Sequence, residues 1–384
     1  MTWQTKKLGE VCEVIAGQSP EGKFYNKFGK GLPFYQGKRE FTEKFIGKPT
    51  TWTTKTTKEA LTGDILMSVR APVGPINFAK EKICIGRGLA AIRAGKEINK
   101  DFLFNFFKNF ESEIVGNAGA VFNSISKTQI EGIEIPVPSV AEQGRIVGKL
   151  DKVFGEVGRA RENAERNLKN AKELFERYLQ GAFANQGKPA SAKSFGVAKW
   201  EEKKLGEVCE VIAGQSPEGK FYNKSGKGLP FYQGKKEFTK KFIGEPTTWT
   251  TKITKEAQEG DILMSVRAPV GPINFATEKI CIGRGLAVIR ASRDVDKDFL
   301  FYALYSKQKD ITGNTGAVFA SINKNAIGNL VLFLPPLPEQ GDIVKKLDGL
   351  VGEVRKLEGI YKQKLADLEE LKKSVLKSAF AGEL

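Results

Sequence analysis

The chain has 384 residues, with 61 lysines and arginines against 45 aspartates and glutamates, a formal net charge of +16. This length suffices for two or three domains with ordinary cores, and the charge favours a polyanionic partner. The absence of histidine excludes a histidine general base, a Ser-His-Asp triad and any histidine-ligated metal site. No apolar run is long enough to span a membrane and no signal-peptide pattern opens the chain, so we expect a cytoplasmic protein with no membrane partner.

The first globular part, taken in chain order, mixes short strands and helices. Residues 6–17 alternate as a strand that stops at a glycine, and residues 17–38 form a basic, glycine-rich loop with aromatic residues between the lysines. Residues 50–57 fit an extended edge, residues 65–70 and 83–85 are buried strands separated by a turn at 72–75, and residues 89–93 make a further strand. Residues 101–114 have helical apolar spacing, and Ser126 can cap a short helix over residues 127–131.

A long amphipathic helix follows over residues 139–183, because apolar residues recur there at steps of four and three. At 1.5 Å per residue such a helix is about 60 Å long and outruns a small domain. A second helix with a matching apolar stripe occupies residues 336–380, which predicts an intramolecular coiled coil. Two separate amphipathic helices, each lying on its own domain, are the alternative. The side chains expected in the packed seam are Leu150, Val157, Leu168, Leu347, Val354 and Leu365.

The whole chain is one unit written twice, with an offset of 197 residues that carries Trp3 onto Trp200. Residues 6–27, 63–79 and 81–90 recur unchanged as 203–224, 260–276 and 278–287. We therefore expect an α+β protein: two similar mixed α/β domains on two long antiparallel helices, related by pseudo-two-fold symmetry. The expected boundaries are 1–138 and 200–335 for the domains, 139–183 and 336–384 for the helices, and 184–199 for a flexible linker that is too short for a parallel pair.

Catalytic signals are weak throughout the sequence. The segment GQSPEGK at residues 17–23 has phosphate-loop spacing, but Phe24 stands where a Mg²⁺-binding hydroxyl belongs. Asp64 and Asp261 are simpler as turn residues than as catalytic acids. The four cysteines, Cys12, Cys84, Cys209 and Cys281, stand alone in apolar surroundings, which favours buried free thiols. We predict no catalytic residue and no metal site, although a nucleotide-dependent enzyme stays open as an alternative.

A basic, aromatic loop presented twice, with arginines near it, is the strongest functional signal. Arginine and lysine neutralise phosphates, while arginine, glutamine and serine also read base edges. The competing interpretation places Phe24, Phe34 and Tyr35 in the core and Arg70 and Arg87 in internal ion pairs. The predicted DNA-binding residues are Gln18, Ser19, Lys23, Tyr25, Lys30, Gln36, Lys38, Arg39, Arg70, Arg87, Gln215, Ser216, Lys220, Tyr222, Lys227, Gln233, Lys235, Lys236, Arg267 and Arg284.

Three segments carry a family resemblance: GDILMSVRAPVG, IGRGLAAIR and GAVFNSISKTQIEGIEIPVPSVAEQGRIVGKLD, with their second copies. The chain resembles the DNA-specificity subunits of type I restriction–modification enzymes. PLPEQ at residues 336–340 is nearer the family's usual motif than SVAEQ at 139–143, and the two recognition domains, which normally differ in the family, are nearly the same here.

The resemblance implies that each domain reads one half of a bipartite double-stranded DNA target, and that the helices set the gap between the halves. It implies two methylation subunits as partners, with S-adenosylmethionine chemistry, and restriction subunits that hydrolyse ATP with Mg²⁺. The chain itself would bind none of these cofactors and catalyse nothing. Because the domains agree, the halves should form a near-palindrome. A scaffold whose two domains bind another protein, without reading bases, is the remaining alternative.

Overall fold

A computed structural model describes residues 3–116, 124–184, 200–311 and 321–384. These form two compact units, Met1–Arg166 with Tyr361–Leu384 and Asn167–Ile360. Each unit holds one globular domain, the start of one long helix and the end of the other. Residues 185–199 of the linker expected at 184–199 lie outside the described residues, and Ala184 is the last residue of a long helix.

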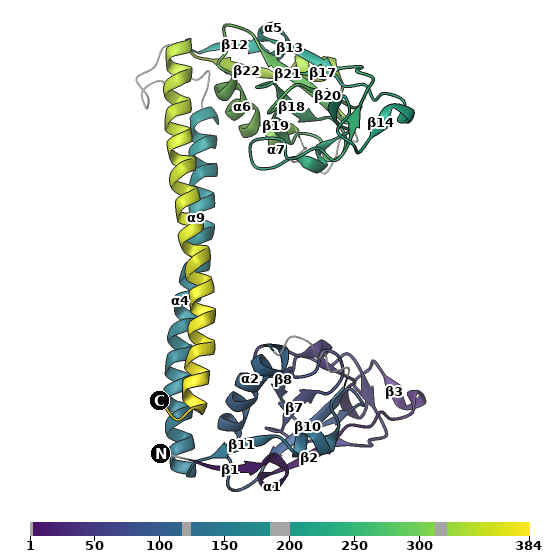
Figure 1. Cartoon of the computed structure of the whole chain (residues 1–384), viewed down its shortest axis with the longest axis vertical. Coiled ribbons are helices and arrows are strands. Elements are labelled where there is room, and N and C mark those ends of the chain that lie inside the picture. The colour runs from purple at the N-terminus through teal and green to yellow at the C-terminus, as the bar shows by residue number, and fades with distance from the viewer. Residues whose placement is uncertain (1–2, 117–123, 185–199, 312–320) are drawn as a thin grey trace. The chain divides into compact units, whose positions relative to one another are not determined.

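The first domain contains three small sheets and three helices (Figure 1). A two-stranded sheet pairs β1 (Gln4–Lys7) with β11 (Glu134–Val137). An antiparallel sheet has the order β2 (Cys12–Ala16), β10 (Leu89–Ala94), β7 (Ile65–Ser68), β8 (Ile76–Phe78). A five-stranded sheet has the order β3 (Tyr25–Asn26), β5 (Trp52–Thr53), β4 (Leu32–Tyr35), β9 (Ile83–Ile85), β6 (Glu59–Ala60). The α-helices are α1 (Leu8–Val11), α2 (Lys100–Gly116) and α3 (Lys127–Glu131), and the 3₁₀ turns are η1 (Gly22–Phe24) and η2 (Lys38–Glu40).

The four-stranded sheet is the middle layer of this domain, because side chains alternate between the two faces of a strand. Ile65 and Met67 of β7 join a core with α2 and α3, whereas Leu66 between them faces the other way. Leu66 packs there with Tyr35 of β4 and Ile83 of β9, both from the five-stranded sheet. One face of the five-stranded sheet therefore packs against the four-stranded sheet. The loops of the five-stranded sheet are free to carry polar residues.

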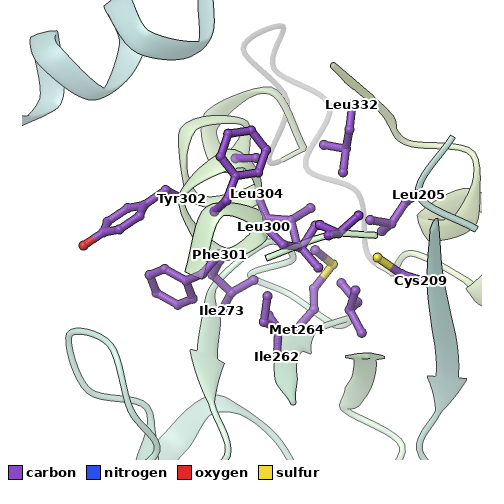
Figure 2. Packing of buried hydrophobic residues seen from close by; sticks show 14 of the residues in the cluster. Leu205, Cys209, Ile262, Met264, Ile273, Leu300, Phe301, Tyr302, Leu304 and Leu332 are labelled. Atoms are coloured by element: carbon purple, nitrogen blue, oxygen red, sulfur yellow. The ribbon is translucent and has the colours of Figure 1, made fainter. Parts of the chain in front are cut away.

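The second domain repeats this architecture, with the same strand orders. Its core contains side chains from α5, β18 and α6 (Figure 2). The Tyr302 hydroxyl points out of this core and donates a hydrogen bond to Asp348 at 2.5 Å. The elements are β12 (Glu201–Lys204), α5 (Leu205–Val208), β13 (Cys209–Ala213), η3 (Gly219–Phe221), β14 (Tyr222–Asn223), β15 (Leu229–Tyr232), η4 (Lys235–Glu237), β16 (Trp249–Thr250), β17 (Glu256–Ala257), β18 (Ile262–Ser265), β19 (Ile273–Phe275), β20 (Ile280–Ile282), β21 (Leu286–Ala291), α6 (Lys297–Ser306), α7 (Gln308–Ile311), α8 (Lys324–Gly328) and β22 (Val331–Leu334).

The two long helices, α4 (Val140–Ala184) and α9 (Leu337–Phe380), pair antiparallel within each unit. In the first unit the end of α9 brings Leu376 into the core that contains Leu150 near the start of α4 (Figure 1). In the second unit the end of α4 brings Leu179 against Leu347 near the start of α9. The predicted antiparallel coiled coil is confirmed, and the alternative of separate helices is wrong. No helix of the described segments is long and apolar enough to cross a membrane.

A buried glutamine fixes the start of each long helix to its domain. Gln143 is 0% exposed; its Oε1 accepts the Asn99 N–H at 2.7 Å, and its Nε2 donates to the Glu97 and Pro138 carbonyls at 2.9 and 2.8 Å. Gln340 makes the equivalent bonds in the second copy. Since an unpaired buried polar group is costly, this glutamine holds domain and helix together at one geometry.

Two local predictions were wrong. The strand expected over residues 6–17 is broken by the helical turn α1, because Leu8 and Val11 are both buried and must point to the same side. The segment 50–57 is not an edge, because β5 pairs with β3 on one side and β4 on the other.

Ser126 does cap α3, and its hydroxyl accepts the Gln129 N–H at 3.3 Å. All four cysteines are buried and free, as predicted.

Candidate nucleic-acid interface

Three chain segments meet where strands β2, β4 and β9 of the first domain end. Strands β4 and β9 are parallel, so the residues that follow them, Gln36 and Gly86, lie at the same edge. The Gly86 N–H donates to the Tyr35 carbonyl at 2.8 Å, and the Gln18 N–H donates to the Ile85 carbonyl at 3.0 Å. The loop after β2 is thereby fixed beside the other two strand ends.

Glycines make this convergence sterically feasible. A Cβ at Gly17 would lie 2.2 Å from the Gly86 carbonyl oxygen, and one at Gly88 would lie 2.4 Å from the Gln36 carbonyl oxygen. No real side chain tolerates such distances, so only glycine lets the three backbones approach this closely. The motifs IGRG and IAGQS therefore build one surface.

The side chains on this edge form a short hydrogen-bond chain. The Arg87 backbone N–H donates to Ser19 Oγ at 3.3 Å, and the Ser19 hydroxyl donates to Gln36 Oε1 at 3.0 Å. Gln18 and Gln36 are exposed and Ser19 is half-buried. Of the predicted residues, these three and Arg87 are brought together.

Arg70 and Arg87 line a cavity of about 210 Å³ together with Lys127, and none of the described residues that line it is acidic. Both arginines are exposed, and neither makes an ion pair with any residue that the structure describes. The Lys127 ammonium lies 3.5 Å from Glu131. The competing interpretation, internal ion pairs for Arg70 and Arg87, is wrong, and the cavity suits an anion or the edge of a nucleic acid.

The internal ion pair belongs instead to Arg93, which the sequence analysis did not select. Its guanidinium contacts both oxygens of the buried Asp64 at 3.0 and 2.8 Å, and Glu13 at 2.7 Å. The hydrogen bonds that Arg93 donates to Asp64 raise the pKa of Arg93. Asp64 also closes a turn by accepting the Leu61 N–H at 2.7 Å, so its predicted role as a turn residue is confirmed.

The aromatic residues divide between core and support. Phe34 and Tyr35 are buried, as the competing interpretation held, whereas Phe24 is only half-buried. Tyr25 stacks on Phe34 with ring centroids 4.7 Å apart, and its hydroxyl donates to the Pro20 carbonyl at 2.7 Å. Burial raises the pKa of Tyr25. The ring therefore supports the loop from beneath.

The cations in the loops that follow β2, β3 and β4 are exposed. The Lys23 ammonium lies 2.6 Å from the Glu21 carboxylate and over the Phe24 ring. Because both charged side chains are largely exposed, Lys23 is solvated and able to exchange partners. Lys38 and Arg39 lie in η2, directly after the Gln36 strand end, and Lys30 lies in the loop between β3 and β4. None of these side chains is hydrogen-bonded to Ser19, Gln36 or Arg87 in the described part of the chain.

The second domain reproduces the edge. The Arg284 N–H donates to Ser216 Oγ at 3.2 Å, and the Ser216 hydroxyl donates to Gln233 Oε1 at 3.0 Å. Tyr222 stacks on Phe231 at 4.8 Å. The other predicted residues of this copy are exposed: Gln215, Lys220, Lys227, Lys235, Lys236 and Arg267.

The predicted seam residues differ in burial. Leu150 and Leu347 are 0% exposed and Val354 is 8% exposed, whereas Val157, Leu168 and Leu365 are half-buried. Leu150 and Leu347 belong to the cores in which domain and helix pair meet, whereas Val354 and the three half-buried residues lie outside these cores.

The phosphate-loop geometry is not formed by residues 17–23. The segment leads into the three-residue turn η1 and then strand β3, so it does not run into the N-terminus of an α-helix. Phosphate loops bind through such an N-terminus, and the nucleotide-dependent alternative loses its structural basis.

Comparison with known proteins agrees with this architecture. The family model described as "Type I restriction modification DNA specificity domain" matches residues 1–165 and 198–366. A putative type I restriction enzyme MjaX specificity subunit from Methanocaldococcus jannaschii is 29% identical, with 100% of this chain and 93% of that protein covered. The Escherichia coli EcoDI specificity subunit is 23% identical, covering 100% and 88%.

Two solved structures are similar over the full chain. A chain from a study of complex assembly and conformational transition of the type I R-M system has a TM-score of 0.83 at 29% identity, covering 100% of this chain and 98% of that one. The HsdS subunit from Thermoanaerobacter tengcongensis has a TM-score of 0.67 at 28% identity, covering 100% and 97%.

Proposed function

The chain belongs to the type I restriction–modification DNA specificity family, and we propose that the strand-end edge of each domain reads one half of its bipartite DNA target. One observation carries this proposal: each domain presents the same exposed polar cluster, flanked by two arginines that have no carboxylate partner among the described residues. Glutamine, serine and arginine are the side chains that read base edges, and surrounding lysines bind phosphates.

The two halves of the target should be alike. The segments that build the edge, 17–27 and 81–90, are unchanged in the second copy. If a pseudo-two-fold axis relates the two domains, as the repeat predicts, identical reading surfaces require inverted half-sites on opposite strands, separated by a gap that neither domain reads. The differences near the edge are few, such as Phe28 against Ser225 and Arg39 against Lys236, and would change at most a preference for flanking bases.

The long helices would recruit the partner subunits. Leu174, Ile360 and Leu371 are 52%, 59% and 45% exposed on the helix surfaces, and exposed apolar side chains suit a protein interface. We propose two methylation subunits there, joined by restriction subunits in a complete complex. S-adenosylmethionine chemistry and ATP hydrolysis with Mg²⁺ would belong to these partners, so this chain would be a non-catalytic, cytoplasmic subunit without a cofactor of its own.

Mapping methylated adenines in the source genome tests the proposal. The expected result is a near-palindromic, gapped motif with adenine methylated on both strands. The matched variants Arg70→Ala and Arg267→Ala should each relax one half of that motif and leave the other intact. Two unrelated half-sites would overturn the symmetric target while leaving DNA reading in place. DNA binding without any base preference in the full complex would favour the protein-binding scaffold instead.

A further inference from the structure

The amide orientation of Gln36 is set by the residues behind it. The Ser19 oxygen accepts the Arg87 backbone N–H at 3.3 Å, and the Ser19 hydroxyl hydrogen is donated to Gln36 Oε1 at 3.0 Å. The Arg87 N–H is itself fixed, because Gly86 and Gly88 on either side bond to the end of β4. A rigid backbone therefore orients the serine, and the serine orients the amide.

The surroundings of Gly86 hold the amide oxygen on the inner side. A Cβ at Gly86 would lie 2.8 Å from Gln36 Oε1 and 3.0 Å from Ser19 Oγ. These two oxygens therefore occupy the space in which a side chain at residue 86 would lie. In the second domain, a Cβ at Gly283 would likewise lie 2.9 Å from Gln233 Oε1. With the oxygen turned inward, the exposed end of the glutamine is its NH₂ group.

We propose that Gln36 and Gln233 are specificity-determining residues that donate hydrogen bonds to an acceptor on a base edge, and that Ser19 and Ser216 are the positioning residues that keep the amide in this sense. An unconstrained glutamine can rotate its amide and satisfy donors or acceptors, so it discriminates weakly. A glutamine held with NH₂ outward selects guanine O6 or N7, adenine N7 or thymine O4 in the major groove, and disfavours the cytosine and adenine amino groups. This inference rests on the proposed function.

A single-domain substitution gives the sharpest test, because the other domain serves as the control within the same molecule. Gln36→Glu keeps the side-chain shape and replaces the NH₂ donor with an acceptor oxygen. The parent and the variant, each assembled with their methylation subunits, would select binding sites from DNA with both half-sites randomised. The expected result is one half-site that keeps the parental sequence and one that changes at a single base pair, toward a base with an amino group, by roughly tenfold or more.

Ser19→Ala separates positioning from direct contact. It removes the hydroxyl that orients the amide and leaves the donor in place, so the preference at that same base pair should weaken without reversing. The matched control Lys30→Ala removes a loop cation outside the cluster; it should lower affinity for all sequences alike and leave base preference unchanged. Thermal unfolding of each variant confirms that the domain is intact.

The outcomes are distinguishable. Unchanged base preference in the Gln36→Glu variant, beside a parent that reads bases, would overturn this inference and leave the proposed function standing. Changes at both half-sites would also overturn it, since the effect would then not be local to one domain. A parent without any base preference would overturn both the proposed function and the inference.

Discussion

Three arginines of the first domain lie in or just after strands but differ in exposure and in ion pairing. Arg70 and Arg87 extend from strand ends toward solvent, whereas Arg93 lies within β10 and pairs with Asp64 and Glu13. The local sequence does not distinguish them, because each stands one or two positions after a valine or an isoleucine. The distinction depends on register: Arg93 lies opposite Glu13 of β2, and β10 also pairs with β7, which Asp64 directly precedes. Register between distant strands is set by tertiary packing, which local pattern does not reveal.

The Arg93–Asp64 pair should matter for stability. Arg93→Ala leaves the carboxylate of Asp64, with its side chain 4% exposed, without its cation. Breaking a buried pair costs about 3–5 kcal/mol, and the partial exposure of Arg93 reduces this to roughly 2–4 kcal/mol. Urea unfolding of the whole chain would measure the loss. Lys82→Ala, which breaks the more exposed Lys82–Glu59 pair, is the matched control and should change the free energy of unfolding by less than about 1 kcal/mol. Equal effects of the two variants would contradict the burial argument.

For single helices and strands, the number of residues in the element decided whether its type could be predicted from the sequence. The helices α4 and α9 have 45 and 44 residues, so their apolar periodicity was repeated often enough to fix their type. The turn α1 has four residues and strands β3 and β5 have two each, too few for any period to register. The parallel pairing of β4 with β9, which creates the candidate edge, joins segments about fifty residues apart and has no local signal.

The packed part of the helix seam gives an element-scale prediction. Leu150 and Leu347 are equivalent in the repeat and both 0% exposed, so Leu→Ala at either position should cost about 2–5 kcal/mol. The two variants should be similar because their surroundings correspond. Leu371→Ala, at a side chain 45% exposed, is the control and should change the free energy of unfolding by about 0.5 kcal/mol or less. Denaturant unfolding checks all three, and a seam that tolerated both buried substitutions would not be a core.

Across the whole molecule, the two copies agree where the candidate edge lies and diverge where domain meets helix. Residues 105–110 read NFFKNF, and their counterparts 302–307 read YALYSK. In the second unit this change brings the Tyr302–Asp348 hydrogen bond, and Lys241 lies 3.3 Å from the same carboxylate. The contacts between domain and helix have thus diverged in chemistry, whereas the segments 17–27 and 81–90 of the candidate edge have not. This pattern is the expected one if both domains are required to read the same bases.

Each long helix starts on one domain, and its end docks on the other domain. Leu376, Ala379 and Phe380 of α9 pack into the first domain's core, with Phe380 5.1 Å from Phe102. Their equivalents in α4 are Leu179, Ala182 and Phe183, the same three residue types. Leu179 and Phe183 pack into the second domain's core in the same manner, with Phe183 5.5 Å from Phe299.

A chain cut after Phe183 should therefore form a homodimer. Alone, it would leave the groove vacated by Leu376, Ala379 and Phe380 open and its own Leu179 and Phe183 exposed. Two copies can fill each other's grooves, an isologous exchange in which each helix end docks on the partner's domain. Sedimentation velocity should give a dimer whose dissociation depends on concentration, and Leu179→Lys should shift it to monomer without unfolding the domain. A truncated chain that stays monomeric and folded at high concentration would show that the two helix ends are not interchangeable, despite their matching side chains.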